Sequence, residues 1–451
     1  MPYAHGDSAR RSHARVVQAM PEPLEARRML SAVTVTGTKG DDEISITHSG
    51  GEIVVTRNGA ELRYDADDVT SVEVDAQGGN DKVVVAEGVD TPVVLKGGSG
   101  NDALTGGSGN DRLYGGTGDD TLSGGAGDDV LVTVGGSSDD DRLTGGRGRD
   151  VFWADPSPTD RASDVSSGER LHAVGSFMNY RVRRSDGSFG TETVPTSLAG
   201  QDLPDPVAKG HNGWEDFSDH PLFPSDGPSD VDVDQNGVPD CYFLSSLASL
   251  GRAARQRLTD RVVDLGDGTY AVRFERGGKG FFVRVDGDLP VHSRGTPYYA
   301  GLGREGSIWA AVVEKAWAFF RRSEGTYDSI AFGRSKEVYQ ALGIAGAKLA
   351  EADEFGSAKD LLETIDDVIR GGAAATFWTK GTTPSGVPLR TRHVLTIVRV
   401  VRDKSGAPIA LHLRDPYKDD GRVKDGTNDG YITISAAHAW SAVRGVTWCR
   451  G

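Results

Sequence analysis

The sequence predicts a multidomain chain, with an all-β region near its N-terminus and an α+β domain in its C-terminal half. The first prediction rests on a nine-residue repeat rich in glycine and aspartate over 97–153. The second rests on an apolar pattern of helical period over 240–254, followed by strand-like and helical segments. We therefore divide the chain into a basic leader at 1–32, a β-rich region at 33–153, a linker at 154–213 and an α+β domain at 214–451.

Composition and charge exclude several classes of partner. The 451 residues carry a formal net charge of −16, and the sequence pI is near 5.1. An acidic chain repels nucleic acid and anionic membranes, so we expect neither as a partner. No apolar run reaches the ~18 residues that a transmembrane segment needs. Only two cysteines are present, Cys241 and Cys449, which excludes a disulfide framework.

The leader is rich in arginine and lacks the continuous apolar core of a secretory signal peptide. Its segment LEARRML at 24–30 resembles the L-E-x-R-x-L-L segment found ahead of large exported proteins of some bacteria. The alternative is a leader without a targeting role. Either way, this segment does not contribute to the predicted fold.

Residues 33–94 are expected to form short strands. Runs of alternating β-branched residues are separated by Gly, Asn and Asp, which is the pattern of strands and turns. Two pieces, GTKGDDEIS at 37–45 and AQGGNDKVV at 76–84, are degenerate copies of the repeat that follows them.

The repeat reads GGSGNDALT, GGSGNDRLY, GGTGDDTLS and GGAGDDVLV from residue 97, and then GSSDDDRLT and GGRGRDVFW after a slip. It matches the G-G-x-G-x-D-x-U-x nonapeptide of the RTX, or haemolysin-type, parallel β-roll. Glycines permit turns whose carbonyl groups crowd a cation, the aspartate supplies charge, and the apolar eighth residue points into the roll. The resemblance implies bound Ca²⁺ and six candidate ligands: Asp102, Asp111, Asp120, Asp129, Asp141 and Asp150.

The first four of these aspartates are nine residues apart, so we expect them to line up along the stack. Stacked carboxylates without a cation repel one another, and the roll should therefore become ordered when it binds Ca²⁺. The alternative is a flexible linker, which the regular spacing and the periodic leucine argue against. After residue 153 the repeat ends and prolines accumulate, so we expect a linker that contains a short strand in SFMNYRVRRS at 176–185.

An acidic loop at 230–240 leads directly into a helix that is expected to start at Cys241. Pro239 ends the loop and Asp240 is a suitable N-cap. A cysteine in the first turn lies near the positive end of the helix dipole, which favours the thiolate and makes the sulfur a nucleophile. Gln235, six residues upstream, is an amide donor that could stabilise an oxyanion beside the sulfur.

Two other interpretations of this loop stay open at this point. A single cysteine on an apolar helix is often only a small buried side chain. The D-x-D-x-N-G run at 232–237 also fits the opening of an EF-hand calcium loop. The twelfth position from Asp232 is Phe243, however, where such a loop needs a bidentate carboxylate.

The run QNGVPDCYFL at 235–244 resembles the calpain-type cysteine protease signature Q-G-x-x-G-D-C-[WY]-F-L. It departs from the signature at Asn236 and Pro239, where the family has glycine. Later segments follow the family in order: YAVRF at 270–274, VRVDGDLPV at 283–291, WAAVVEKA at 309–316 and DGYITIS at 429–435. The resemblance implies a papain-like α+β protease core.

The same resemblance supplies the remaining site residues. His393 opens the run HVLTIVRV, where the family's G-H-x-x-x-V histidine falls, and Arg392 replaces the usual small residue. LRDPYKDDG at 413–421 resembles L-R-N-P-W-G, which places Asp415 at the asparagine that orients the histidine and Tyr417 at the shielding tryptophan. We expect the aspartate to accept the histidine Nδ1–H, which gives a Cys–His–Asp set.

The resemblance therefore implies a calcium-dependent cysteine endopeptidase that hydrolyses protein or peptide substrates through a thioester. Cys241 is the expected nucleophile, His393 carries the proton, and Asp415 fixes the histidine tautomer. Gln235 and the Cys241 backbone N–H are expected to receive the oxyanion. One alternative is a catalytically inactive, calcium-ordered surface or adhesion protein whose protease-like domain binds partners. A transglutaminase-like acyltransferase shares the Cys–His–Asp set, but the order of strands favours the calpain type.

The repeats also predict a location. Extracellular calcium modules bind the ion weakly, and cytosolic calcium would leave such sites empty. We therefore expect export, or display at the surface of a bacterial cell.

Overall fold

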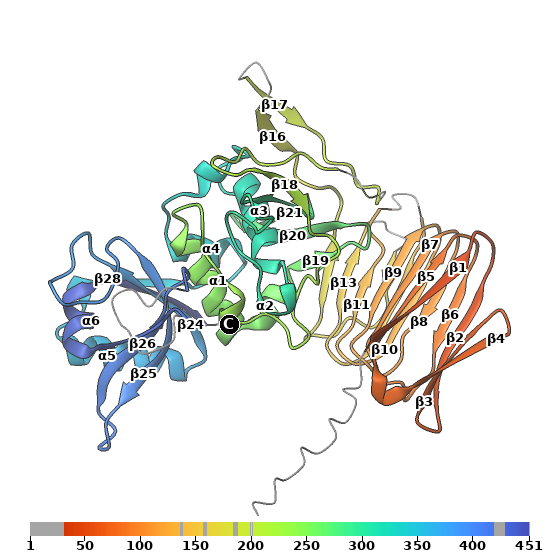
Figure 1. The fold of residues 1–451 in the computed structure, drawn as a ribbon, viewed down its shortest axis with the longest axis horizontal. Coiled ribbons are helices and arrows are strands. Elements are labelled where there is room, and N and C mark those ends of the chain that lie inside the picture. The colour runs from red at the N-terminus through yellow and green to blue at the C-terminus, as the bar shows by residue number, and fades with distance from the viewer. Residues whose placement is uncertain are drawn as a thin grey trace, which may run out of the picture.

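The computed structural model describes residues 31–135, 139–156, 160–183, 188–198, 200, 202–418 and 429–450. The basic leader predicted at 1–32 lies outside this range, apart from Ser31 and Ala32, which begin the first strand. Three bodies follow one another along the molecule: a β-roll, a mainly helical half-domain and a half-domain built on one sheet (Figure 1).

The roll consists of two facing sheets, and successive strands mostly alternate between them. Neighbouring strands are parallel, except in the antiparallel β2–β3–β4 edge. The first sheet has the order β1 (Ser31–Thr38), β5 (Val69–Gln77), β7 (Val93–Ser99), β9 (Arg112–Thr117), β11 (Val130–Val132), β13 (Val151–Ala154) and β15 (Arg170–Ala173). The second has the order β14 (Arg161–Ala162), β12 (Arg142–Arg147), β10 (Thr121–Ala126), β8 (Ala103–Thr105), β6 (Lys82–Val85), β2 (Glu43–Ser49), β3 (Glu52–Arg57) and β4 (Ala60–Asp65).

The core of the roll confirms the predicted role of the eighth repeat residue. Leu104, Leu122 and Leu143 are in register on adjacent strands of the second sheet, and each is at most 1% exposed. Leu113 and Leu131 occupy the same position in the first sheet. Burying one such side chain contributes about 2 kcal/mol, so the periodic leucine is what holds the two sheets together.

The roll is longer than the repeat, and the segment predicted as a linker is ordered where it is described. Strands β14 and β15 extend the two sheets to Ala173. A hairpin of β16 (Tyr180–Arg183) and β17 (Phe189–Glu192) follows, and β18 (Gly213–Asp216) pairs with β22 (Asp288–Val291). The prolines suggested a linker, but Tyr180 is fully buried and stacks on Phe319 at 3.9 Å between ring centroids.

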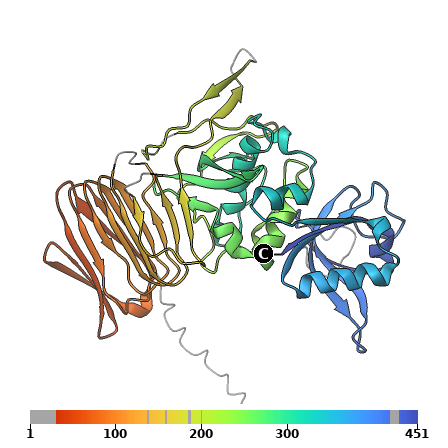
Figure 2. The ribbon, with the colours of Figure 1, turned by 180° about the vertical axis from the view of Figure 1, so that it is seen from behind.

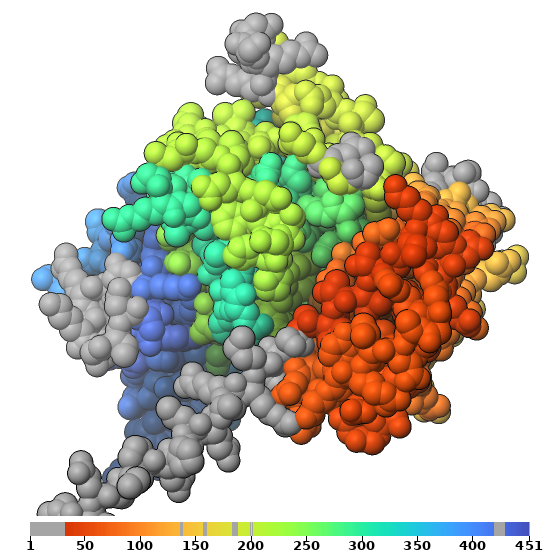
Figure 3. All heavy atoms as spheres, turned by 45° about the vertical axis from the view of Figure 1, so that its right-hand side comes forward, coloured from red at the N-terminus to blue at the C-terminus, as the bar shows by residue number. Residues whose placement is uncertain are grey.

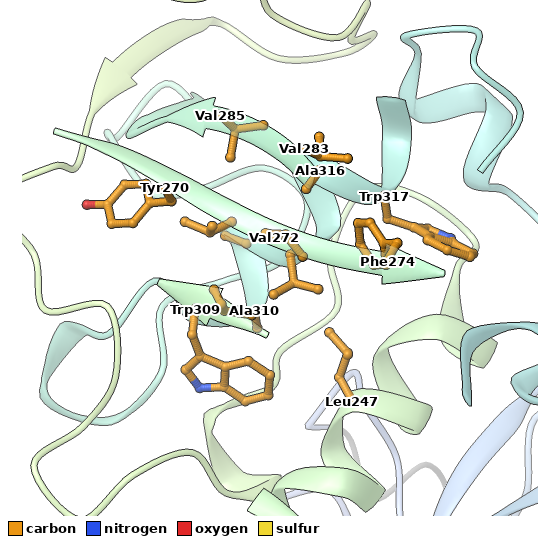
Figure 4. Close-up of a cluster of buried hydrophobic side chains, with 14 of the residues drawn as sticks. Leu247, Tyr270, Val272, Phe274, Val283, Val285, Trp309, Ala310, Ala316 and Trp317 are labelled. Carbon is orange, nitrogen blue, oxygen red and sulfur yellow. The ribbon is translucent and has the colours of Figure 1, made fainter. Parts of the chain in front are cut away.

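The helical half-domain surrounds a three-stranded sheet of β19 (Val262–Asp264), β20 (Thr269–Arg276) and β21 (Lys279–Asp286). Its helices are α1 (Cys241–Ala253), α2 (Arg255–Thr259), α3 (Trp309–Phe320) and α4 (Ser335–Ala341). Figure 4 shows Leu247 of α1, Val272 and Phe274 of β20, and Trp309 and Trp317 of α3 gathered in one apolar cluster. This packing fixes the helix that starts at Cys241.

The second half-domain is a six-stranded antiparallel sheet covered by two helices. Its order is β23 (Lys348–Glu351), β28 (Val443–Arg450), β24 (Ala373–Thr379), β25 (Val394–Arg402), β26 (Pro408–Arg414) and β27 (Tyr431–Ser435). Helix α5 (Ala358–Arg370) starts at its Ser357 cap and ends before Gly371, and α6 (Ala436–Ala442) packs beside it.

Helix α1 joins the two half-domains. It packs on β24 and β25, and the Ser245 hydroxyl donates to the Val394 carbonyl at 2.8 Å. The Thr396 hydroxyl donates to the Ser245 carbonyl at 3.0 Å. These buried bonds hold the start of α1 next to the start of β25, and His393 immediately precedes β25.

The roll packs directly on the helical half-domain, on the side away from the six-stranded sheet (Figures 2 and 3). Arg149 forms an ion pair with Asp260 at 2.5 Å, and Trp153 lies edge-on to Phe282 at 5.8 Å. Tyr114, Val132 and Trp153 of the roll belong to the same apolar cluster as α1 and α3. Order in the roll and order in the helical half-domain are therefore coupled through a shared core.

Candidate active site

The candidate nucleophile lies where the sequence predicts it. Helix α1 begins at Cys241, whose side chain is partly exposed, whereas Phe243, Leu244 and Leu247 are fully buried. The cysteine is therefore not one of the enclosed apolar side chains of its helix. Cys449, in contrast, is buried in the sheet, and burial raises the pKa of its thiol to about 12.

Asp240 occupies the N-cap position, but its side chain makes no capping bond, contrary to the expectation from sequence. The carboxyl instead faces Glu314 of α3, and both side chains are almost completely buried. Glu314 accepts the Ala300 backbone N–H at 2.8 Å. Burial, and for Asp240 also the charge of Glu314, raises the pKa of both carboxyls, so the pair retains a shared proton near neutral pH.

His393 and Asp415 meet at the ends of neighbouring strands. The His393 Nε2 and Asp415 Oδ1 atoms are 2.8 Å apart, and both residues are at most 4% exposed. The Cys241 side chain also acts on the ring and contributes to the raised pKa of His393. The sequence predicts Nδ1 as the nitrogen bonded to the aspartate, which is wrong: Nε2 takes that place, and Nδ1 is the nitrogen left for the sulfur.

The surroundings of the ring fix its orientation. The Tyr417 ring stacks on His393 at 5.5 Å between centroids, and the Tyr417 backbone N–H donates to Asp415 Oδ1 at 3.0 Å. The Thr379 hydroxyl accepts the His393 backbone N–H at 2.9 Å. Burial lowers the pKa of His393, but the hydrogen bonds to Asp415 and Cys241 raise it more, and the resulting pKa is about 9. An imidazolium beside the sulfur is the state that stabilises a thiolate.

Gln235 lies next to this group, but its amide is engaged locally. Its Nε2 donates to the Val238 carbonyl at 2.7 Å, and its buried Oε1 atom has no partner among the described residues. The Gln235 backbone N–H donates to the Pro416 carbonyl at 2.8 Å, which ties the cysteine loop to the loop that carries Asp415. One amide N–H is therefore committed to Val238, and the second is the one left for a ligand.

Two pockets flank the candidate site. One, of about 430 Å³, includes Cys241 in its wall together with Phe332, Trp378, Arg392 and Arg444. The other, of about 540 Å³, is lined by Gln235, Asn236, Gly237, His292, Tyr298, Arg390 and Tyr417. A chain lying across Cys241 would thus find space on both sides of the sulfur.

The six predicted aspartates of the roll are buried. They form two separate lines, so aspartates nine residues apart in the sequence are not neighbours in the structure, contrary to the single line that the sequence predicts. Asp102 donates its backbone N–H to the Asp120 carboxylate, and Asp120 donates to Asp141, both within 2.9 Å. Asp111, Asp129 and Asp150 form the second line in the same way. One nonapeptide makes only half a coil, so the nearest equivalent aspartate is 18 residues away, or 21 across the slip. Asp42, Asp81 and Asp160 extend the first line.

These carboxylates suit a calcium ion. The Oδ2 atoms of Asp102, Asp120, Asp129 and Asp150 are buried without a hydrogen-bond partner. A Cβ on Gly115 would lie 2.3 Å from Asp120 Oδ2, so only glycine leaves space beside that oxygen. Burial is the main reason that the pKa of Asp120 and of Asp129 is raised to about 8. Burial also raises the pKa of Asp102, Asp111 and Asp141 to about 6, and that of Asp150. A divalent cation with oxygen ligands removes this penalty.

Two acidic clusters of the helical half-domain, among the described residues, are already paired with basic side chains. Asp232, in the loop with the EF-hand-like opening, is fully buried and accepts the Arg304 Nε–H at 2.7 Å. Asp234 lies 3.4 Å from the Lys418 ammonium. Asp202, Asp286 and Asp288 form a group of carboxylates, but the buried Lys315 ammonium already contacts Asp286 at 2.5 Å. In both clusters a basic side chain of the protein occupies the place of a cation.

Sequence reasoning missed several residues around the site. Thr379, Arg390 and Arg304 carry no local signal, because each acts on a segment distant in the chain. Arg390 lies over the Tyr417 ring at 4.9 Å and 3.7 Å from Asp415 Oδ2. Only the fold reveals these partners.

A cysteine at a helix start, next to a histidine and a carboxylate supplied by a sheet, is an arrangement that cysteine peptidases use. The model of the calpain family of cysteine proteases matches residues 200–425, and the chain belongs to this family. The RTX calcium-binding nonapeptide repeat matches residues 96–131 and 135–156.

Curated relatives match the same domain. The calpain-type cysteine protease ADL1 of Oryza sativa subsp. japonica is 31% identical over 181 residues, which is 38% of this chain and 8% of that protein. The human calpain-1 catalytic subunit is 27% identical over 200 residues, 40% of this chain and 27% of that protein. The chain thus spans about a quarter or less of these relatives. Within the described residues, no helix has the length and apolarity to cross a bilayer.

Proposed function

We propose that this chain is a calcium-dependent cysteine endopeptidase that uses Cys241, His393 and Asp415. The observation that carries the proposal is the His393 ring, which is held by Asp415 through Nε2 and whose pKa is raised by both Asp415 and the Cys241 side chain. Protein or peptide chains are the substrates that this family and the two flanking pockets favour.

The proposed reaction has two halves. The Cys241 thiolate attacks the peptide carbonyl carbon, and the C–N bond breaks as the His393 imidazolium gives its Nδ1 proton to the leaving amine. A water molecule then attacks the thioester, His393 accepts its proton, and the C–S bond breaks to release the acid and restore the thiolate. Asp415 holds the Nε2–H throughout, so that Nδ1 continues to face the sulfur.

Backbone and amide donors are available for the oxyanion. The first N–H groups of a helix have no intrahelical partner, and the Cys241 N–H is the first of α1. The second Nε2–H of Gln235 is the other candidate donor, since the first is bonded to Val238. Removing a single donor of this kind costs about 10²–10³-fold in kcat.

Calcium is proposed to act through the roll rather than at the cleft. In the roll, one oxygen each of Asp102, Asp120, Asp129 and Asp150 is buried without a partner. In the protease domain, in contrast, Asp232 and Asp286 are neutralised by Arg304 and Lys315. When bound, Ca²⁺ would be held by the two lines of aspartates and would remove their repulsion. The ordered roll then completes the apolar core that it shares with α1 and α3.

Repeats of this type are typical of extracellular bacterial proteins, and we propose the same location here. The roll needs more calcium than the cytosol contains, so the proposed enzyme would be active only after export or at the cell surface. The basic leader is the candidate export segment.

The test compares Cys241→Ala and Cys241→Ser with Cys449→Ser as the matched control, with casein as substrate and Ca²⁺ present. Loss of the nucleophile is expected to reduce kcat/KM by about three orders of magnitude or more, while the control keeps its activity. Labelling by a thiol-directed inhibitor should occur at Cys241 and not at the buried Cys449. Unchanged proteolysis in both Cys241 variants would refute the proposal, and an unlabelled, inactive Cys241 would favour the inactive binding protein.

A further inference from the structure

The pocket that includes Cys241 has a wall that the proposed mechanism leaves unexplained. It combines the aromatic side chains of Phe332 and Trp378 with the guanidinium groups of Arg392 and Arg444. Phe332 is 75% exposed, which is unusual for a large apolar side chain. The wall thus combines apolar rings with positive charge, in a chain whose net charge is −16.

Two residues of this wall have a backbone conformation that favours glycine. Phe332 has φ 53° and Arg392 has φ 51°. Arg392 directly precedes His393, at the position where the calpain-type pattern has a small residue. A large side chain held in a left-handed conformation beside a reactive group indicates a functional constraint, because a glycine there would be unstrained.

The two arginines have no acidic partner within the described part of the chain. Arg444 lies over the Trp378 ring at 5.5 Å, and the Arg392 side chain extends along Gly381. Both are exposed and both also line the next pocket, of about 560 Å³, with Lys380. That outer pocket carries Glu351 and Asp353 as well, whereas the wall of the pocket that includes Cys241 has no acidic residue among those that line it.

We propose that this pocket is a substrate subsite for an acidic side chain, an aspartate or glutamate of the peptide near the cleaved bond. The paired guanidinium groups bind the carboxylate, and the Phe332 and Trp378 rings cover its aliphatic part. This inference rests on the proposed peptidase activity and adds the substrate class to it.

The experiment uses the full-length protein with Ca²⁺ and fluorogenic peptides that are identical except for one position. Each position on either side of the cleaved bond carries Asp, Asn, Ala or Lys in turn. At one position Asp is expected to be cleaved about tenfold faster than Asn in kcat/KM, and Lys slowest. High salt should reduce the difference between Asp and Asn, since the pocket is partly open to solvent.

Variants identify the residues responsible. In Arg392→Gln and Arg444→Gln the ratio of kcat/KM for Asp over Asn should fall toward one, while Arg392→Lys retains part of it. Lys359→Gln removes an equally exposed charge on α5 and is the matched control, with the ratio unchanged. Cleavage of the peptides without acidic preference at any position would overturn the subsite alone. Absence of cleavage of every peptide would overturn the proposed peptidase, and the subsite with it.

Discussion

The roll and the protease domain both bury carboxylates, but they compensate these charges in opposite ways. In the roll, Asp120 and Asp129 are buried with one oxygen each unpartnered, and burial raises the pKa of both to about 8. In the protease domain, the fully buried Asp232 is bonded to Arg304, whose Nη1 also reaches Asp226 at 2.8 Å. The hydrogen bonds to Asp232 and Asp226 raise the pKa of the Arg304 guanidinium. The bond to Arg304 lowers the pKa of the Asp226 carboxyl.

The difference shows which part of the molecule requires an external ion. A carboxylate paired with a basic side chain is compensated in every medium, whereas an unpaired buried carboxylate is compensated only when a cation binds or a proton is taken up. At Asp232 and Asp286 the protease domain therefore supplies the cation from its own sequence, whereas the aspartates of the roll have no such partner.

Removing calcium should have the largest effect, and only one of the two regions should respond directly. With a chelator at pH 9, above the pKa of about 8 of Asp120 and Asp129, amides of the roll strands are expected to lose their protection against hydrogen exchange, because the ionised aspartates repel one another. Mg²⁺ should not restore this protection, since it prefers a small octahedral site. If the roll amides keep their protection in the chelator, the roll does not require an external cation and the contrast with the protease domain is wrong.

Removing a basic side chain that pairs with a buried carboxylate should destabilise the protease domain. Arg304→Gln leaves the buried Asp232 without compensation, and we expect a loss of about 3 kcal/mol of unfolding free energy in the protease domain. Thermal unfolding measures it, with Arg322→Gln, an exposed arginine of the same domain, as the control. The calcium affinity of the roll should not change. A variant as stable as the unmodified protein would show that Arg304 does not replace a cation.

The smallest predicted effect is a pH dependence of the calcium-free roll. The folded pKa of Asp102, Asp111 and Asp141 is raised to about 6, and that of Asp120 and Asp129 to about 8. Their contribution to stability is therefore fully present below the unfolded pKa of about 4 and is lost as pH rises through 6 to 8. Without calcium, the Tm of the roll should fall by roughly 10 °C over this range. A Tm that rises instead would mean that the aspartates are already compensated.

Local sequence patterns predicted where helices begin and end. The features that they did not predict depend on contacts between residues far apart in the sequence. Helix α5 has a Ser357 cap and a glycine after its end, and the start of α1 at Cys241 follows from Pro239 and the apolar period beyond it; these signals act over a few residues. The two lines of aspartates could not be read from the period, because nine residues do not reveal that a repeat makes only half a coil. The Nε2 bond of His393 and the Arg304–Asp232 pair depend on strands and loops far apart in the sequence.

The most direct test of this account is a calcium titration of the full-length chain at neutral pH with two readouts, hydrogen exchange of the roll and proteolysis. The unmodified protein should show one common midpoint for both. In the Asp120→Asn and Asp129→Asn double variant both midpoints should move together to higher calcium. A proteolytic activity that keeps its own calcium midpoint, while the roll of the variant no longer responds, would place a calcium site in the protease domain and contradict the account.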